Sequence, residues 1–336
     1  MEYFKDIGYL WMIIFIMISA GIAKDNNLFS PLYYYIKSIF KSNRSVLILV
    51  SAIGGILPIQ GRVTVSAGLI DTMAHKDGPQ RQKMGMVDYL ATHHYYMWSP
   101  LEKTVILPIA AFGLTYTSWI ELVWPLIVAS LVFIGGYVMT QIDENDIVIQ
   151  ETSPDLPKVI KHVVPMFLSI ASFIVTDNYY LSFGTLALYY MMVTKTRNVI
   201  HYINWQVISI VGVIIVLSNY IKNNEEFFQS FIVGSSLDPT TFLGMFIISC
   251  MAFFASFAMG SSGKFVAFSI LLSQVFGYEY FLWFFALDYS AYLISPTHKC
   301  VLIGNRYFGT SFTSYYKVLG SWSLVLLSIS YCLTFL

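Results

Sequence analysis

Charged residues are scarce in this sequence. Only 11% of the 336 residues are charged and 57% are hydrophobic, whereas soluble domains have about 25% charged and about 45–50% apolar residues. Lys and Arg balance Asp and Glu at 19 each, so no excess of positive charge is available for nucleic acid. This composition argues against a nucleic-acid-binding module and indicates a chain that is surrounded by lipid.

Cysteines are also few, and the common catalytic motifs are missing. Cys250, Cys300 and Cys332 show no Cys-x-x-Cys spacing, so we expect neither a disulfide framework nor a transition-metal site. The sequence has no His-Glu-x-x-His or Gly-x-Ser-x-Gly motif and no paired aspartates within its apolar runs. We therefore expect no enzyme activity and no cofactor other than Na⁺ or H⁺ as a coupling ion.

Long apolar runs indicate membrane-spanning helices, which need about 20 mostly apolar residues each. The first run has no small-residue cleavage site, so we expect it to remain as a membrane anchor. Tyr and Trp crowd the ends of the runs, as at a membrane interface. We expect an all-α membrane protein with about eight spans. The unbroken runs cover 8–23, 119–141, 160–176, 179–194, 205–221 and 318–336.

Two further regions have apolar flanks around a polar, glycine-containing centre. Residues 45–74 contain Pro58 and Gly61, and residues 246–276 contain Met-Gly-Ser-Ser-Gly-Lys at 259–264. Each flank has about a dozen residues, which at 1.5 Å per residue reach roughly half-way through a bilayer. We therefore expect two re-entrant hairpins, whose exposed backbone must line a protein-covered or watery cavity.

The second half of the sequence resembles the first. Tyr96-Met-Trp-Ser-Pro-Leu-Glu-Lys103 aligns with Tyr292-Leu-Ile-Ser-Pro-Thr-His-Lys299, with Tyr, Ser, Pro and Lys identical. We interpret the chain as two membrane repeats, each with a span, an interfacial segment, a hairpin, a helix interrupted at Ser-Pro and a final span. The predicted units are repeat 1 at 1–141 with its interrupted helix at 85–115, connecting helices at 142–204, and repeat 2 at 205–336 with its interrupted helix at 279–308.

The distribution of Lys and Arg predicts how the repeats are oriented. With the amino terminus outside, fourteen of the 19 fall in cytoplasmic segments, and Lys5 and Lys222 fall outside. The remaining three, Arg62, Lys103 and Lys264, lie near the proposed helix breaks. This positive-inside bias places both termini on the outer side of the cytoplasmic membrane and the two hairpins on opposite sides of it. We therefore expect the repeats to be inverted.

Inverted repeats with broken helices at matching positions are typical of transporters, which bind substrate and ions near the bilayer midplane. Hairpin tips and Ser-Pro breaks would supply hydroxyls, backbone groups and helix ends there, and Na⁺ could bind at the tips. Gly61 and Gly263 would let the backbone turn tightly and approach a ligand. The candidate binding residues are Pro58, Gln60, Gly61, Arg62, Ser66, His94, Ser99, Pro100, Ser261, Ser262, Gly263, Lys264, Asp288, Ser295, Pro296 and His298.

Arg62 and Lys264 occupy matching positions beside the two hairpin tips. A cation at membrane depth costs at least ~2.5–3.5 kcal/mol and is functional or paired by default. Both could recognise an anionic substrate, and Arg62 could hold a carboxylate through two parallel hydrogen bonds. The alternatives are a structural ion pair with Asp71, Asp88 or Asp288, or a side chain that extends to the membrane interface.

Histidines and one acidic residue lie near the breaks. His298 follows the second Ser-Pro motif, and His93 and His94 precede the first. They could relay protons or bind substrate, or be buried histidines with satisfied hydrogen bonds, the interpretation that we prefer for His93. Asp288 lies in the apolar segment FALDYSAYLISP, where ion coordination, proton carriage and a salt bridge to Lys264 all remain open.

Three segments resemble a family of integral membrane proteins known as domain of unknown function 401, of the ion transporter superfamily. They are GGILPIQGRVTVSA at 54–67, VDYLATHHYYMWSPL at 87–101 and SPTHKCVLI at 295–303. The resemblance implies the fold of that superfamily over nearly the whole chain, a homodimer and an elevator-like transport mechanism.

These features together predict a secondary active transporter in the lipid bilayer, coupled to Na⁺ or H⁺, that moves a small anionic solute across the cytoplasmic membrane. Two other functions remain as alternatives. A passive anion channel on the same fold would conduct without saturation or ion coupling. A non-transporting enzyme or accessory protein within the membrane would need a convergent catalytic set.

Overall fold

The computed structural model describes residues 2–56, 70, 79–147, 155–232, 237–260 and 262–336. Within these ranges the side chains of several helical residues, Lys264 and Lys299 among them, lie outside the description. The described residues form helices joined by turns and contain no β-strand. The chain is therefore an all-α protein, as its composition predicts.

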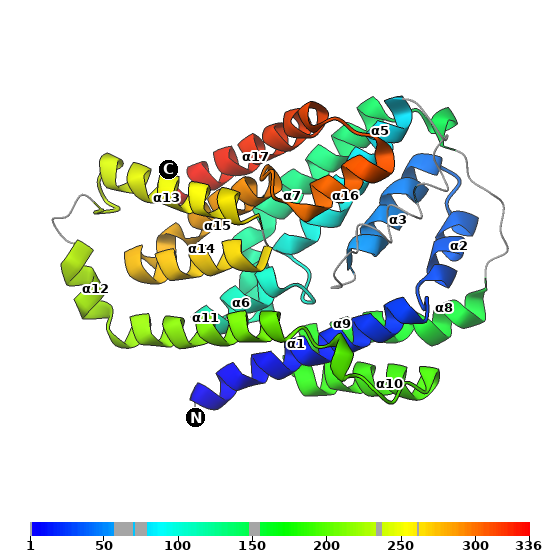
Figure 1. Ribbon diagram of the computed structural model, residues 1–336, viewed down its shortest axis with the longest axis horizontal. Helices are drawn as coiled ribbons and strands as arrows, with labels where there is room; N and C mark the ends of the chain where they lie inside the picture. Colours follow the sequence, from blue (N-terminus) through cyan, green and yellow to red (C-terminus); the bar gives the residue numbers. More distant parts are fainter. Residues whose placement is uncertain (1, 57–69, 71–78, 148–154, 233–236, 261) are drawn as a thin grey trace.

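Long helices alternate with short ones along the chain, and both termini lie toward the left-hand end of the molecule (Figure 1). The α-helices are α1 Glu2–Asp25, α2 Ser30–Ile39, α3 Asn43–Ile56, α5 Pro79–His93, α6 Lys103–Phe112, α7 Tyr116–Gln141, α8 Leu156–His162, α9 Val164–Thr176, α10 Thr185–Thr194, α11 Trp205–Asn223, α12 Glu225–Ile232, α13 Phe242–Met259, α14 Ser262–Phe276, α15 Phe281–Leu293, α16 Lys299–Phe308 and α17 Phe312–Phe335. The shorter helices are η1 His94–Met97, η2 Glu144–Asp146, η3 Tyr180–Gly184, η4 Ile200–Tyr202 and η5 Tyr278–Tyr280.

Four described helices are long and apolar enough to cross a membrane: α7, the α8–α9 pair, α13 and α17. Between 22% and 28% of each apolar window is buried inside the protein. The side chains on their outer faces are large and apolar, such as Val132, Leu168, Phe242 and Leu324, each more than 60% exposed. Apolar surface on this scale is typical of contact with lipid, so the chain is a membrane protein.

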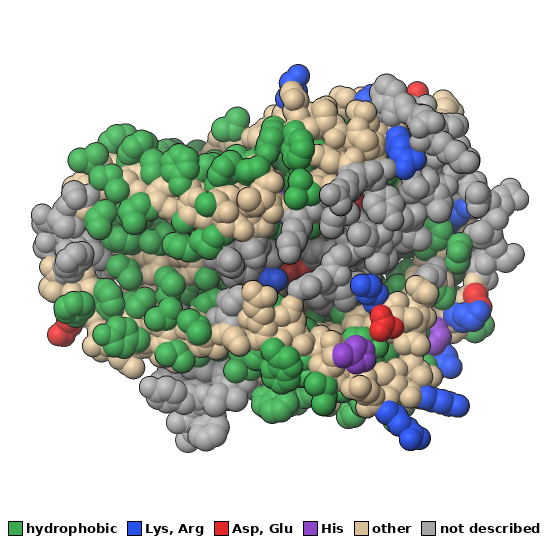
Figure 2. Space-filling model, in the orientation of Figure 1, with side chains coloured by type: hydrophobic (Ala, Val, Ile, Leu, Met, Phe, Trp, Pro, Cys, Tyr) green, Lys and Arg blue, Asp and Glu red, His purple; other side chains and the backbone are tan. Residues whose placement is uncertain are grey.

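The exposed surface differs along the long axis of the molecule. In Figure 2, hydrophobic side chains dominate the left-hand part, while Lys and Arg gather toward the right-hand end. Exposed cations of the described chain include Lys24, Lys41, Lys158, Lys195 and Arg197. All five are among the residues that the charge distribution assigns to the cytoplasmic side.

The stretches that follow the two Ser-Pro motifs correspond residue by residue at a spacing of 196. Helices α6 and α16 begin at Lys103 and Lys299 and end at phenylalanines. Gly113 and Gly309 then cap them in the left-handed conformation, with φ of 66° and 63°, which glycine adopts without steric cost. Thr115 and Ser311 accept a hydrogen bond from the backbone N–H three residues later and start α7 and α17.

Corresponding helices run in opposite directions where they meet. Trp322 Nε1 of α17 donates to Ser130 Oγ of α7 at 3.0 Å. Tyr315, about two helical turns before Trp322, lies close to Tyr137, about two turns after Ser130. Helices α5 and α15 also cross antiparallel, because Tyr89 OH contacts Leu293 O and Tyr289 OH contacts His93 O.

Helix α15 is the central helix of the described structure. Every residue in it except Trp283 is buried, and it packs against α13, α14 and α17. Phe281, Phe284 and Phe285 are fully enclosed, and burying a phenylalanine contributes roughly 1.5–3 kcal/mol. A polar side chain in this helix therefore lies in the apolar core.

The second predicted hairpin consists of α13 and α14, but its arms have 18 and 15 residues instead of about a dozen. The expectation that Gly263 makes the tight turn is wrong, because Gly263 lies in the first turn of α14. The turn is at Gly260, which caps α13 with φ 53°. The first hairpin beyond α3 lies largely outside the described residues.

Candidate functional site

Both interrupted helices break at their Ser-Pro motif. Helix α5 ends at His93 and continues as η1 before Ser99, while α15 ends just before Ser295. Ser99, Pro100 and Ser295 are buried, whereas Pro296 is exposed. Proline supplies no backbone N–H and clashes with the preceding turn, so the sequence ends each helix in the protein interior.

The two serines form different hydrogen bonds at the two helix breaks. Ser99 Oγ accepts from Leu101 N at 3.3 Å, within its own turn. Ser295 Oγ donates to Phe257 O at 2.5 Å and accepts from Thr297 N at 3.3 Å. Phe257 lies near the end of α13, so Ser295 connects the second break to the second hairpin.

A pair of buried histidines joins the two interrupted helices. His93, the last residue of α5, and His298, the N-cap residue of α16, are at most 1% exposed. Their Nε2 atoms lie 3.2 Å apart. The other ring nitrogens are also held, since His93 Nδ1 lies 2.7 Å from Tyr89 O and His298 Nδ1 lies 3.0 Å from Tyr292 O.

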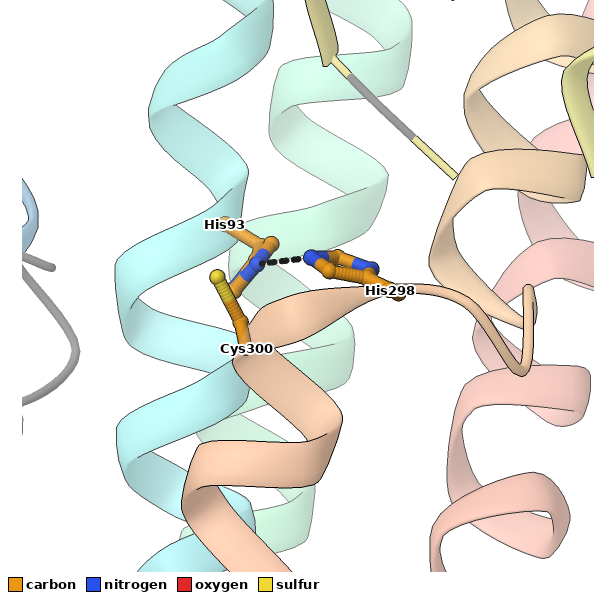
Figure 3. Close-up of side chains that lie close together, drawn as sticks. All are labelled: His93, His298 and Cys300. Atoms are coloured by element: carbon orange, nitrogen blue, oxygen red, sulfur yellow. Dashed lines mark hydrogen bonds between the residues drawn. The ribbon is translucent and has the colours of Figure 1, made fainter. Parts of the chain in front are cut away.

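Cys300 completes this cluster from the first turn of α16. Its Sγ and one ring nitrogen from each histidine lie within 4.8 Å of one another. Figure 3 shows the three side chains converging between α5 and the start of α16. We call His93, His298 and Cys300 the His–Cys cluster.

Tyrosines surround the His–Cys cluster and connect matching positions of the two stretches. Tyr292 OH donates to Tyr96 OH at 3.1 Å, and these residues are aligned in the sequence repeat. Tyr289 OH donates to His93 O at 2.6 Å, again across 196 residues. Tyr89 OH lies 2.8 Å from His298 Nδ1. These bonds orient both imidazoles and fix how α5 crosses α15.

A second buried polar group lies deeper in α15. The Asp288 side chain is fully buried, and its two oxygens accept from Ser256 Oγ at 2.8 Å and Ser269 Oγ at 2.5 Å. Ser256 belongs to α13 and Ser269 to α14, so both arms of the second hairpin hold one carboxyl group. We call Asp288, Ser256 and Ser269 the carboxyl cluster.

The two histidines before the first break have different surroundings, and His93 is buried with its Nδ1 2.7 Å from Tyr89 O, as the preferred interpretation of this residue expects. His94 Nδ1 contacts Ala91 O at 2.9 Å, and its ring packs on Tyr95 and Trp98, outside the His–Cys cluster. His93 is the residue that meets His298. The available signal was helical spacing, because His93 follows Tyr89 by four residues and so shares its face.

Cys300, Ser256 and Ser269 were also missed. Cys300 follows His298 by two residues, a short spacing that pointed to no metal motif. The serines looked like ordinary small residues within apolar helices, and only the packing of α13 and α14 on α15 brings them to Asp288.

The remaining predicted residues belong to the hairpin tips. Ser262, Gly263 and Lys264 lie in the first turn of α14, with the Lys264 side chain outside the description. The expectation that Arg62 and Lys264 approach a common anion therefore stays a prediction. The candidates that lie outside the described residues are Pro58, Gln60, Gly61, Arg62, Ser66 and Ser261.

The histidines of the His–Cys cluster and all three residues of the carboxyl cluster are buried, whereas Cys300 is half-buried. A groove of ≈ 770 Å³ is found elsewhere, between α5, α7 and α17, where Met86, Tyr137 and Lys317 line it. It includes none of the residues of either cluster.

Comparisons with known proteins give no family for this chain. No family model matches the sequence, and no curated protein matches it. The function is therefore argued from the site.

Proposed function

We propose that this protein is a secondary active transporter that couples the movement of a small solute to Na⁺ or H⁺. The observation that carries this proposal is the carboxyl cluster, a fully buried acid held by hydroxyls from both arms of the second hairpin. An ionisable group inside a membrane protein is costly and by default serves ion or proton movement.

The chemistry of the carboxyl cluster suits a small hard cation. A buried carboxylate is expensive unless a cation or proton neutralises it. Oxygen ligands are those that hard cations prefer, and Asp288, Ser256 and Ser269 offer only oxygens. A proton would neutralise the same group by making it a carboxylic acid. Either ion could therefore be released when the carboxyl group becomes exposed, which links ion movement to a change of conformation.

The arrangement of helices favours transport over a function that requires no movement of the helices. Asp288 precedes the second Ser-Pro break by seven residues, and its serine partners come from α13 and α14, so one movement of the hairpin would alter the ion site. Helices α7 and α17 correspond in sequence and run antiparallel, an arrangement that inverted repeats would produce. In the proposed mechanism the hairpins and interrupted helices move as one elevator-like unit against the remaining helices.

The proposed membrane placement follows the charge distribution. The end of the molecule rich in Lys and Arg faces the cytoplasm, and both termini face outside. The proposed transporter is a homodimer in the cytoplasmic membrane. A small anion is the proposed substrate, with Arg62 and Lys264 as its proposed ligands.

The test begins with the purified protein and needs no known substrate. Na⁺ titration at constant ionic strength, and pH titration without Na⁺, should reveal which ion raises the melting midpoint. The same assay with a panel of organic and inorganic anions selects a substrate for uptake by proteoliposomes. Asp288→Asn should lose the stabilisation by Na⁺ or the pH dependence, because the amide can neither bind a cation tightly nor release a proton.

Uptake then tests coupling directly. Wild-type protein should accumulate the selected anion under an imposed gradient of the effective ion, and Asp288→Asn should only equilibrate it. Asp143→Asn, at an exposed loop position, is the matched control and should behave as wild type. Accumulation by Asp288→Asn equal to wild type would refute the assigned role, and uptake that ignores both gradients would favour the channel.

A further inference from the structure

We propose that the His–Cys cluster binds a thiophilic transition-metal ion of the Zn²⁺ type between the two interrupted helices. The donors are the Nε2 atoms of His93 and His298 and the Sγ of Cys300. This site is separate from the carboxyl cluster, and the inference does not depend on the proposed function.

The two imidazoles approach each other through ring nitrogens that can both act as metal ligands. A neutral imidazole carries one N–H donor and one acceptor nitrogen. The carbonyl oxygens of Tyr89 and Tyr292 lie 2.7 and 3.0 Å from the two Nδ1 atoms and favour protons there. Tyr89 OH also lies 2.8 Å from His298 Nδ1, and because this hydroxyl donates to Leu293 O at 3.2 Å, it can accept from a proton on that nitrogen. The Nε2 lone pairs of His93 and His298 then face each other across 3.2 Å. A cation between them removes this repulsion and leaves both carbonyl contacts satisfied.

The distances between the donor atoms suit a tetrahedral metal ion. Zn²⁺ binds imidazole nitrogen at about 2.0–2.1 Å and thiolate sulfur at about 2.3 Å. In a tetrahedral site these lengths place two nitrogens about 3.3 Å apart, close to the observed 3.2 Å. The limit of 4.8 Å for all three donor atoms leaves Cys300 only a short side-chain adjustment from the ion.

The groups behind the nitrogen donors hold both imidazoles in place. Histidines that bind metals almost always donate their second ring N–H to a carbonyl, a carboxylate or water, which fixes the tautomer and the ring orientation. Here Tyr89 O and Tyr292 O provide this for both rings. Tyr89 also stacks on His93, with ring centroids 3.9 Å apart. The imidazoles are therefore already oriented for a metal.

A bound ion would change how the two halves are connected. His93 ends α5, whereas His298 and Cys300 begin α16, so the metal would clamp one interrupted helix to the other. Binding replaces the thiol proton of Cys300, which leaves to solvent, and the ion takes two neutral nitrogens and one thiolate. Three protein donors leave a fourth tetrahedral position for water or an anion.

Cobalt provides a direct test on the purified full-length protein in detergent after removal of metals with a chelator. Co²⁺ should give the absorption of a tetrahedral site with a thiolate-to-metal charge-transfer band, and added Zn²⁺ should displace it. Cys300→Ser should abolish the charge-transfer band. Cys250→Ser and Cys332→Ser, which change the other two cysteines, should keep it.

Histidine variants test the nitrogen donors. His93→Gln and His298→Gln should each weaken Zn²⁺ binding at least about tenfold, since even outer-shell changes cost that much, while the exposed His201→Gln should not. The readouts need no transport, so they can fail while the proposed function stands. A charge-transfer band that survives Cys300→Ser, or Zn²⁺ affinity unchanged in a folded histidine variant, would overturn the site. If both histidine variants fail to fold, Cys300→Ser still tests the site, because Cys300 is only half-buried and its substitution should be tolerated. Absence of Co²⁺ binding would also overturn it and would mean that the histidines share a proton.

Discussion

The two stretches that correspond at a spacing of 196 residues, one around each Ser-Pro motif, have similar backbone structure but different side-chain chemistry. Asp288 binds serines on two other helices, whereas Thr92 at the matching position donates to Asp88 O in its own helix at 2.7 Å. Tyr289 matches His93, and the two are hydrogen-bonded to each other. A common scaffold therefore carries an acid in one half and an imidazole in the other.

The second break shows the same contrast. His298 and Cys300 correspond to Glu102 and Thr104 of the first break. Thr104 Oγ1 donates to Tyr96 O at 2.6 Å and so stabilises its own half, while His298 reaches His93 of the opposite half. Matching positions conserve the turns and caps, because these fix the backbone. The two stretches diverge at His298 and Cys300, whereas Tyr96 and Tyr292 are identical and bond each other across the halves.

The largest expected effect concerns the direction of the two halves. In a background without the three native cysteines, Gln80→Cys should react with an impermeant maleimide only from the cytoplasmic side, and Asn223→Cys only from outside. The beginning of α5 and the junction of α11 with α12 lie at opposite ends of the molecule (Figure 1). Reaction of both from the same side would exclude oppositely oriented halves.

The next effect separates strain from crowding at glycines with left-handed backbone. Gly260→Val should cost about 1–2 kcal/mol for the conformation and a further ~1–3 kcal/mol for overpacking. Its Cβ would collide with Thr297 Oγ1 and lie 2.9 Å from Ser295 Oγ. Gly309→Val has a similar φ with no described heavy atom within 4 Å and should show only the first cost. Melting midpoints in detergent compare them, and equal losses would mean that the hairpin turn is not crowded.

A smaller effect tests the bond shared by matching tyrosines. Tyr96→Phe and Tyr292→Phe each remove the same hydrogen bond and should each cost ~0.5–1.5 kcal/mol. Because the bond can be lost only once, the double variant should cost clearly less than the sum of the singles. Thermal unfolding measures all three, with the exposed Tyr220→Phe as control. Additive losses would show that the two hydroxyls do not stabilise each other.

The smallest effect concerns the matching helix caps. Thr115→Ala and Ser311→Ala each remove the oxygen that accepts from the third residue of α7 or α17, at a cost of about 1 kcal/mol. Thr117→Ala and Thr313→Ala change exposed positions inside the same first turns and are the controls. Losses of stability that differ strongly between Thr115→Ala and Ser311→Ala would contradict an equal local structure of the two caps.

Much of the fold follows from local rules. Scarce charge and long apolar runs predict an all-α membrane protein, and the runs at 8–23, 119–141 and 205–221 lie within α1, α7 and α11. The repeated Ser-Pro motif predicts both breaks, since proline acts on its own helix turn. Helix length was harder to predict, since the two arms of the second hairpin have 18 and 15 residues instead of about a dozen.

The functional clusters depend on long-range packing. The sequence by itself determined that Asp288 lies in an apolar helix and that His298 follows a break. Only the tertiary structure decided that Ser256 and Ser269 hold this acid and that His93, not His94, meets His298 and Cys300. The reason is geometric: adjacent helix residues point about 100° apart, so which one meets a distant helix depends on how the helices cross.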